Sequence, residues 1–456
     1  MTILDTALDP RAASFLDNRS TALAALAMLE AAHAQAREGG GEREVTRHHA
    51  RGKLLPRERI ELLVDRDTAL LELAATAGVP HGAGLVTAIG VIEQNECMIV
   101  GNDPTVREVG LTDAGRFKAE RAVELARQYR LPIVLLWESV AEANEIVAHG
   151  CSPIISAIFG TADAPQHLAD HSVIIRGHGL PSHADSVAED ERNAVRLVRQ
   201  AVRRLCQSRI PHPAGEVAGH ARGLPRGGQP PGGYASAGLT SGGLMPGGSV
   251  SGGVGRGGRG RDGLAPGGFA LGGFVLGGQG PGALGERGVQ LGLPPRHEAD
   301  DLLAVHRADL TEVLARVLDG SEFEELRPHR GGAIIAGFGA VHGHRVAVLG
   351  NSAPDVDPES LHKGIELTRL AEMAGLPVVV LASSGDGDEP LLSRVLSSRY
   401  QISILLDEKP PAWALASKGL RFTWPIPHGQ VHDGMIDPRD TRTVLGICLS
   451  AMGERS

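Results

Sequence analysis

Several features that define large classes of proteins are missing from this 456-residue chain. It has only four cysteines and no Cys-x-x-Cys pair, so neither a zinc ribbon nor a disulfide framework is indicated. Reduced thiols in a cytoplasmic protein are the simplest interpretation. The opening sequence, MTILDTALDP, has no basic and no apolar region, and we therefore expect no secretory signal. No apolar run approaches the ~18 residues of a membrane span, which argues against a membrane protein.

An excess of positive charge is missing as well. The chain has 45 Lys and Arg against 54 Asp and Glu, which gives a net charge of −9. Because phosphate groups bind to a basic face, this balance argues against nucleic acid as the main partner. The sequence also contains no Gly-x-Ser-x-Gly, no His-Glu-x-x-His, no P-loop and no Gly-x-Gly-x-x-Gly after a strand, so these motifs assign no chemistry.

Two histidine pairs have spacings that a binding site could use. His342 and His344 stand between two strand-like runs, where a solvated hairpin turn is the expected structure. His428 and His432 have a metal-like spacing, but no acidic or thiol partner is obvious nearby. We therefore expect no metal ion in this chain.

What the sequence does contain is one supersecondary unit that occurs twice. Residues 84–139 and 332–384 each read as two short apolar runs, a helical segment, a Leu-Pro break and a buried strand. In the first copy we expect strands at 85–91, 97–100 and 133–137, with a helix from about 114 to 129. The identities that match in order are Gly101-Asn102 with Gly350-Asn351, Lys118 with Lys363, and Leu131-Pro132 with Leu376-Pro377.

Alternating strands and helices flank the two repeats and imply α/β layers with crossover connections. A helix is expected at 21–38 with Ser20 as its N-cap, and another near Pro56 within the segment 50–73. The remaining expected helices are 141–149, 188–207, 310–318 and 441–452, and the remaining expected strands are 153–159, 173–175 and 402–406.

From about residue 210 to residue 295 glycine and proline dominate the composition. Gly-Gly pairs recur there in one five-residue phase. Doubled glycine loses so much entropy on ordering that this repeat cannot build a core, and a flexible linker is the favoured interpretation. An elastin-like packed coil and a glycine-rich contact surface are the alternatives. The insert also resembles Arg-Gly-Gly (RGG) segments of RNA-binding proteins at Arg256, Arg259 and Arg261. Three arginines are weak support for RNA binding in an acidic protein.

Five segments outside this insert carry a resemblance to one family. They are residues 50–63 (ARGKLLPRERIELL), 101–106 (GNDPTV), 118–132 through Lys118, Arg121-Ala122 and Leu131-Pro132, 321–326 (SEFEEL) and 436–442 (IDPRDTR). Together they resemble the carboxyltransferase (β) subunits of biotin-dependent acyl-CoA carboxylases, in the propionyl-, acetyl- and methylcrotonyl-CoA group. The resemblance covers roughly residues 50–207 and 300–452.

This resemblance implies an α/β fold of two crotonase-like (ClpP/crotonase) β-β-α spiral domains. We expect an N-terminal helical segment at 1–49, carboxyltransferase-like domains at 50–209 and 296–456, and the glycine-rich linker at 210–295. The implied partners are an acyl-CoA, a biotin carboxylase or biotin carrier subunit, and further carboxyltransferase-type chains in a homo- or hetero-oligomer such as a ring-shaped hexamer. No cofactor would be bound covalently, because the partner subunit presents carboxybiotin.

In that family the acyl-CoA thioester lies in the N domain and carboxybiotin in the C domain. Each oxyanion is held by backbone N–H groups at glycine-rich turns, where glycine permits a close approach. The resemblance assigns no secure catalytic residue in this chain. The candidates that it assigns are Gly160, Thr161 and Ala162 for the acyl-CoA, and Ser384, Gly385, Ala412 and Trp413 for carboxybiotin.

The chain departs from the family at the turns that should hold these donors. Residues 138–143 read ESVAEA where the family has Asp-Ser-Gly-Gly-Ala-Arg. Ala164-Pro165 and Pro410-Pro411 stand where the family has Gly-Gly pairs. Proline has no N–H to donate, and the loss of one oxyanion donor typically costs ~3–4 kcal/mol in the transition state.

Three functions therefore compete. The first is a carboxyltransferase that moves a carboxyl group from carboxybiotin to the α-carbon of an acyl-CoA. The second is a catalytically degenerate accessory or scaffold subunit, or a homologue repurposed for another acyl thioester. The third is a non-catalytic surface protein that acts through its glycine pentads.

Asp386 and Asp388 follow the strand of the second repeat, where site residues and solubilising acids both occur.

Overall fold

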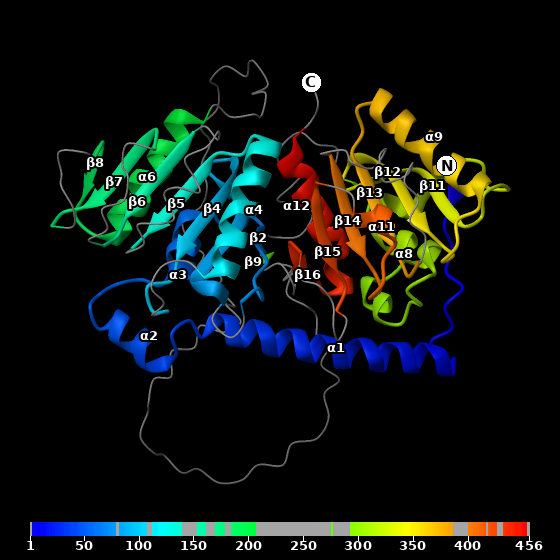
Figure 1. The fold of residues 1–456 in the computed structure, drawn as a ribbon, viewed down its shortest axis with the longest axis horizontal. Coiled ribbons are helices and arrows are strands. Elements are labelled where there is room, and N and C mark those ends of the chain that lie inside the picture. The colour runs from blue at the N-terminus through cyan, green and yellow to red at the C-terminus, as the bar shows by residue number, and fades with distance from the viewer. Residues whose placement is uncertain are drawn as a thin grey trace, which may run out of the picture. The chain divides into compact units, whose positions relative to one another are not determined.

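The computed structural model describes most of the chain outside the glycine-rich insert (Figure 1). The described residues are 2–78, 82–106, 112–138, 153–160, 169–177, 184–206, 275–276, 292–385, 400–415, 418–425 and 432–453. Residues 1–209 and 266–456 belong to one compact unit, which does not include residues 210–265. The domain boundaries expected from the sequence remain predictions. No helix in the described ranges is both long and apolar enough to cross a membrane.

The first half of this unit is built on an eight-stranded mixed sheet. Its strands are β2 (Leu70–Leu73), β3 (Leu85–Ile92), β4 (Asn95–Asn102), β5 (Ile133–Trp137), β6 (Ile154–Ile158), β7 (His171–Ile175), β8 (Ser186–Ala188) and β9 (Val275–Leu276). They are ordered β8-β7-β6-β5-β4-β3-β2-β9. The hairpin β3–β4 is antiparallel, whereas β4 to β8 pair parallel. The parallel strands therefore end at one edge, which is where sites form in α/β sheets.

The second half repeats this arrangement on another eight-stranded sheet. Its strands are β1 (Thr2–Ile3), β10 (Glu322–Glu325), β11 (Ile334–Val341), β12 (His344–Asn351), β13 (Val378–Ala382), β14 (Gln401–Leu405), β15 (Leu420–Thr423) and β16 (Gly434–Met435). They follow the order β1-β10-β11-β12-β13-β14-β15-β16. An antiparallel hairpin, β11–β12, again leads into parallel strands. The two related α/β halves confirm the α/β class and the internal repeat expected from the sequence.

Helices cover both sheets (Figure 1). The α-helices are α1 (Ala13–Arg37), α2 (Glu42–His49), α3 (Pro56–Leu63), α4 (Asp113–Tyr129), α6 (Glu191–Leu205), α8 (Leu310–Val317), α9 (Pro358–Met373), α11 (Ala412–Leu415) and α12 (Thr441–Met452). Short 3-10 turns are η1 (Gly82–Gly84), η4 (Ala299–Leu303), η5 (Asp319–Ser321) and η6 (Pro438–Asp440). The helix of each repeat packs on its own hairpin, α4 on β3 and β4 and α9 on β11 and β12.

A buried lysine occupies the matched position of each repeat helix. Lys118 Nζ donates a hydrogen bond of 2.5 Å to the backbone oxygen of Leu85, and Lys363 Nζ donates one of 2.8 Å to Glu325 Oε1. Burial lowers the pKa of Lys118 to about 8, although the charge of Glu72 opposes this shift. The lysine identity in the repeat thus marks an internal anchor between the helix and the sheet beneath it.

One apolar core runs through both halves. The cluster that contains Tyr129 and Trp137 of the first half also contains Leu420 and Val444 of the second. A polar contact crosses at the same place, because the backbone N–H of Leu420 donates to the hydroxyl of Tyr129 at 3.2 Å. Each half has in addition a core of its own on the other face of its sheet.

Most of the elements expected from the sequence are confirmed, and the differences have local reasons. The helix expected at 21–38 starts earlier, at Ala13, so Ser20 lies inside it and is not its N-cap. The helix expected at 188–207 begins at Glu191, because Ala188 belongs to β8 and Asp190 caps the helix. The segment 50–73 holds a helix and also the unexpected strand β2. The helix expected at 141–149 lies outside the described residues.

The turn of the β11–β12 hairpin is a hairpin turn as expected, and its residues are half-buried. His342 and Gly343 form the two-residue loop between Val341 and His344, with positive φ at both positions. The His342 ring packs against α12, where a Cβ on Gly446 would lie 2.6 Å from His342 Cδ2. Tertiary packing of α12, which short-range sequence does not reveal, covers part of this turn.

Candidate functional site

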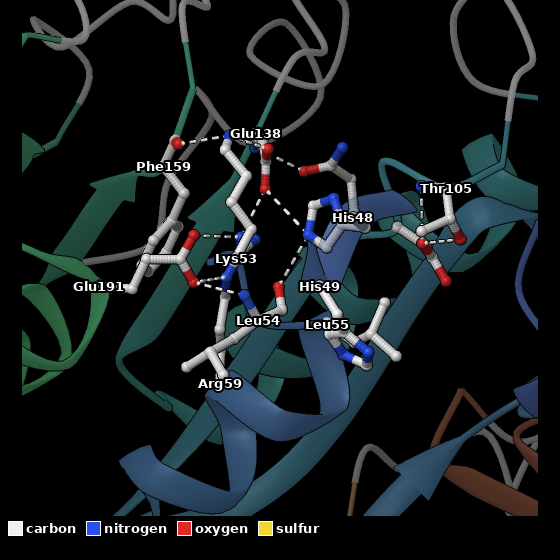
Figure 2. A network of polar contacts seen from close by, with 12 residues as sticks. His48, His49, Lys53, Leu54, Leu55, Arg59, Thr105, Glu138, Phe159 and Glu191 are labelled. Atoms are coloured by element: carbon white, nitrogen blue, oxygen red, sulfur yellow. Dashed lines mark hydrogen bonds and ion pairs between the residues drawn. The ribbon is translucent and has the colours of Figure 1, made fainter. Parts of the chain in front are cut away.

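A buried polar network lies at the carboxyl ends of β5 and β6 (Figure 2). It consists of His48, Lys53, Arg59, Glu138 and Glu191, and we call it the Glu138 network. Glu138 follows β5 directly, Glu191 opens α6, and the other three come from α2, α3 and the loop between them. Five residues from distant parts of the chain therefore meet at the sheet edge that sites commonly use.

Glu138 is the residue that the side chains of Lys53, Arg59 and His48 all face. Its carboxylate forms ion pairs with Lys53 and Arg59, and His48 Nε2 lies 3.7 Å from Glu138 Oε2. The backbone N–H of Glu138 donates to Asn102 Oδ1 at 2.7 Å. Both the main chain and the side chain of Glu138 are thus fixed where β5 ends.

Arg59 joins the two acids of the network. Its side chain is fully buried and donates to Glu191 from Nε at 3.0 Å and from Nη2 at 2.8 Å. Its guanidinium also lies over the Phe159 ring, 4.1 Å from the centroid. A planar fork that pairs bidentately and stacks on an aromatic face is what arginine provides and lysine does not.

Gly160, the first acyl-CoA candidate, lies directly against Glu138. A Cβ on Gly160 would be 2.9 Å from Glu138 Cγ, so the space that this glycine leaves open is filled by the Glu138 side chain. Lys53 Nζ donates to the oxygen of the preceding residue, Phe159, at 3.2 Å. Thr161 and Ala162, the other two candidates on this side, lie outside the described residues.

A cavity of about 420 Å³ lies at the matching edge of the second half. The ends of β12, β13, β14 and β15 contribute to it, together with α1 and the segment around Arg307. Ser384, a carboxybiotin candidate, is among the residues that line it. The other polar side chains around it are Asn18, Thr21, His306, Arg307, Ser352, Ser383 and Asp407.

Arg307 places a positive charge beside this cavity. Its guanidinium donates to the backbone oxygens of Leu406 at 2.5 Å and Pro425 at 2.8 Å, which ties the ends of two strands together. Burial lowers the pKa of Arg307, and the acids Asp407 and Glu408 oppose this effect. The charge is therefore retained next to the carboxyl ends of β14 and β15.

The remaining carboxybiotin candidates have different surroundings. The backbone N–H of Gly385 donates to the oxygen of Lys409 at 3.0 Å, so this donor is engaged within the chain. Ala412 is exposed at the start of α11, whereas Trp413 is fully buried in the core of the second half. Ser384 and Gly385 lie together near Pro411, but the Trp413 side chain packs away from the cavity lining.

The repeated Gly-Asn pair marks the site edge of each of the two sheets. Asn351 Oδ1 accepts from the backbone N–H of Ser383 at 2.9 Å, as Asn102 Oδ1 does from that of Glu138. The matched Gly-Asn pairs therefore mark the same strand-end anchor in both halves. In the sequence these pairs align the repeats, and Gly101-Asn102 belongs to a segment that carries the family resemblance, as do Lys53 and Arg59. No local signal shows that Lys53 and Arg59 meet Glu138.

The described residues offer no metal centre, since they contain no group of three or more His, Cys, Asp and Glu side chains placed to hold an ion. His432 Nδ1 lies 3.3 Å from an Nη1 of Arg421. Burial and this neighbouring cation lower the pKa of His432 to about 4, so the imidazole is neutral near pH 7. Asp386, Asp388 and His428 lie outside the described residues.

A serine–histidine contact on β7 and β8 is not a nucleophile site. Ser186 Oγ lies 3.2 Å from His171 Nε2, and Arg204 donates to His171 Nδ1 at 3.0 Å. Because Arg204 can only donate, Nδ1 must accept, and the neutral ring carries its proton on Nε2. Such a ring donates to the serine and cannot remove the serine proton.

Comparison with known proteins points to one family. The family described as carboxyl transferase domain matches residues 47–164 and 301–384. These ranges include the Glu138 network except Glu191 and, in the second half, Arg307 and Ser384. A probable biotin-dependent acyl-coenzyme A carboxylase beta2 subunit of Mycobacterium tuberculosis is 27% identical over 99% of this chain and 97% of its own. A probable methylcrotonoyl-CoA carboxylase beta chain of Drosophila melanogaster is 26% identical over 83% of this chain and 67% of its own.

A solved structure shares the fold along the whole chain. The beta subunit of geranyl-CoA carboxylase from P. aeruginosa superimposes with a TM-score of 0.69 and covers 99% of this chain and 97% of its own. The two sequences are 19% identical, so this likeness concerns the fold. It agrees with the two related sheets described above.

Proposed function

Because this chain belongs to the carboxyl transferase family of acyl-CoA carboxylase beta subunits, we propose that it transfers a carboxyl group from carboxybiotin to the α-carbon of an acyl-CoA. The observation that carries the proposal is the cavity of about 420 Å³ at the carboxyl ends of β12 to β15. Its volume is within the ~300–1,000 Å³ of small-molecule sites, and its position is one where α/β sheets place ligands.

The lining of this cavity suits a compact polar ring system. Ser384 and Ser383 supply small polar groups at the end of β13, Trp424 supplies an apolar wall, and Arg307 supplies a positive charge. We assign these residues to hold the biotin ring. When a biotin carrier subunit presents it, carboxybiotin supplies the activated carboxyl group.

In the first half we assign the acyl thioester to the edge around Gly160. Lys53, Arg59 and Glu138 hold the ends of β5 and β6 together there, through contacts to the Glu138 carboxylate and the Phe159 oxygen. Their role is to keep two strand ends in register beside the thioester. The assignment of Thr161 and Ala162 to the same side belongs to this proposal.

A second candidate is an accessory or scaffold subunit without carboxyl transfer. The specific observation behind it is the turn beside Gly385, whose N–H is already engaged by Lys409, while Pro410 and Pro411 have no N–H to offer. An oxyanion needs free donors aimed at it, and this turn supplies fewer than a glycine pair would. Such a chain would act by pairing with an active paralogue.

The proposed partners are the same for both candidates. They are an acyl-CoA, a biotin carboxylase or biotin carrier subunit, and other carboxyltransferase-type chains in a homo- or hetero-oligomer in the cytoplasm. The described cysteines Cys97, Cys206 and Cys448 are buried and take part in no disulfide, which is compatible with a reducing compartment.

The deciding assay combines the purified chain with a biotinylated carrier carboxylase subunit, ATP, labelled bicarbonate and acetyl- or propionyl-CoA. Label in malonyl- or methylmalonyl-CoA supports carboxyl transfer. No label from the chain alone, together with co-purification with an active paralogue, supports the accessory role instead.

A cavity-filling variant makes the assay specific for the second half. Ala22 of α1 lines the cavity, whereas Ala24 of the same helix is exposed and does not. Ala22→Trp should raise the apparent KM for the biotin carrier at least ~10-fold by occupying the space, because one blocked hydrophobic contact is worth 1–3 kcal/mol. Ala24→Trp should leave it unchanged. Equal effects of the two substitutions would remove the cavity from the mechanism.

A further inference from the structure

The cations Lys53 and Arg59 enclose one carboxylate from two sides. Lys53 Nζ contacts Oε1 of Glu138 and Arg59 Nη2 contacts Oε2, whereas His48 Nε2 donates to the Leu54 oxygen at 3.1 Å and lies 3.7 Å from Oε2 (Figure 2). One donor on each oxygen is the arrangement that recognises a planar oxyanion. The pocket reaches solvent at Lys53, whose side chain is 21% exposed, while Arg59 is fully buried.

The charge of the network requires an anion at this position. Without Glu138, the two permanent cations Lys53 and Arg59 would face the single negative charge of Glu191. Arg59 already has a buried Nη1 with no hydrogen-bond partner among the described residues. A buried cation without a counter-ion is strongly disfavoured, so the site attracts any anion that fits.

The backbone leaves room for such an anion. Because Gly160 has no side chain, the Glu138 Cγ occupies space that a Cβ at position 160 would invade. The backbone of Glu138 is held independently, by the hydrogen bond from its N–H to Asn102 Oδ1. Shortening the Glu138 side chain therefore empties a space of carboxylate size while the strand end stays anchored.

We propose that Lys53 and Arg59 form a carboxylate-binding site, with His48 beside it, that Glu138 fills from within the same chain. Glu138 is an internal ligand of this site, and it excludes free carboxylates from the edge beside Gly160. Formate and bicarbonate, which are planar oxyanions of similar size, bind there once the internal carboxylate is removed. The site does not depend on carboxyl transfer, so the labelling assay and the test below can fail separately.

The test is chemical rescue of Glu138→Ala in the full chain. Thermal unfolding is measured in sodium formate or sodium bicarbonate and in sodium chloride of equal ionic strength and pH. A ligand of the folded state alone raises Tm with its concentration, so Glu138→Ala should show a saturable rise of a few degrees in formate over chloride. The wild-type chain should show no such difference, because its site is occupied.

Glu138→Gln is the matched control, since glutamine fills the space without supplying the charge. It should be less stable than the wild type and should not respond to formate. In Lys53→Met with Glu138→Ala, Arg59 and Glu191 balance each other, and the apparent affinity for formate should fall about tenfold or more. Equal responses of Glu138→Ala and Glu138→Gln would overturn the proposal.

If Glu138→Ala does not accumulate as folded protein, the refolding yield is measured instead. The denatured variant is diluted from urea into formate or into chloride, and the yield of soluble, cooperatively unfolding chain is compared. A several-fold higher yield in formate supports the site. Equal yields, or a Tm of the folded variant that formate does not change, contradict it.

Discussion

Glu138 shows how one side chain connects elements that are far apart in the sequence. Its partner Arg59 is 79 positions away, and Arg59 in turn pairs with Glu191, 132 positions away. Both acids and the arginine are nearly inaccessible to solvent. Removal of one partner of a buried ion pair leaves the other charge uncompensated, and this makes Arg59 the residue on which the first half most depends.

Arg59→Met should therefore lower the free energy of unfolding by about 3–5 kcal/mol, seen as a lower urea midpoint. Arg176→Met is the control, because Arg176 also pairs bidentately, with Glu189, but both side chains are exposed. That pair is screened by water, and its loss should barely move the midpoint. Similar midpoints for the two variants would show that the Glu138 network adds no stability.

At the scale of an element, the β11–β12 hairpin is held by its turn as well as by its ladder. Asp319 accepts hydrogen bonds from the backbone N–H groups of His342 and Gly343, at 2.9 and 2.7 Å. Burial, assisted by the nearby charge of Arg442, lowers the pKa of His342 to about 4. The hairpin thus contains a histidine that must stay neutral for the turn to remain packed on α12.

This histidine predicts a pH dependence of stability. Between pH 4 and about 6.5 the unfolded chain holds more protons at His342 than the folded chain, so stability falls as the pH falls through that window. From pH 7 to pH 5 the wild type should lose about 2 kcal/mol through this group. In the His342→Asn variant asparagine tolerates the positive φ. Between pH 7 and pH 5 this variant should lose about 2 kcal/mol less free energy of unfolding than the wild type, as measured by urea unfolding.

His329→Asn is the control for this measurement, since His329 is exposed. It should keep the pH dependence of the wild type. The comparison uses the change between the two pH values, because the substitution at 342 also alters packing against Gly446. An unchanged pH dependence in His342→Asn would show that the turn histidine is not the group responsible.

Elements with strong apolar patterns were predictable from the sequence, whereas the four-residue strands β2 and β15 were not. The strand at 133–137 and the helix at 441–452 have the bounds expected from their composition. β2 and β15 have four residues each, and their strand pairing is decided by neighbours far along the chain. Local preference is too weak over four residues to determine such pairing.

At the scale of the whole unit, an ion pair joins the two halves. Arg121 of α4 binds Asp433 through Nε–Oδ1 at 2.8 Å and Nη2–Oδ2 at 2.9 Å, although 312 positions separate them. The same arginine donates to the backbone oxygen of Gly419 at 2.8 Å. With the shared apolar core, this contact makes the stability of each half depend on the other.

Asp433→Asn should therefore reduce hydrogen-exchange protection in both halves, in β5 as well as in β13. Glu325→Gln provides the contrast, because its pair with Lys363 lies within the second half. That substitution should reduce protection in β11 to β14 and leave β5 unchanged. Loss of protection confined to one half in Asp433→Asn would contradict a shared core as the source of coupling.

The sequence by itself determined the repeat, the α/β class and the resemblance to the carboxyltransferase family. Periodic apolar patterns and matched Gly-Asn and Leu-Pro pairs are local signals. They occur at the positions where the backbone of each repeat requires these residue types. Tertiary structure alone decided which groups meet at each sheet edge. Glu138 reads as a departure from the family turn, and only the fold places it against Lys53, Arg59 and Gly160. Contacts across such separations depend on strand order and helix packing, which local sequence does not encode.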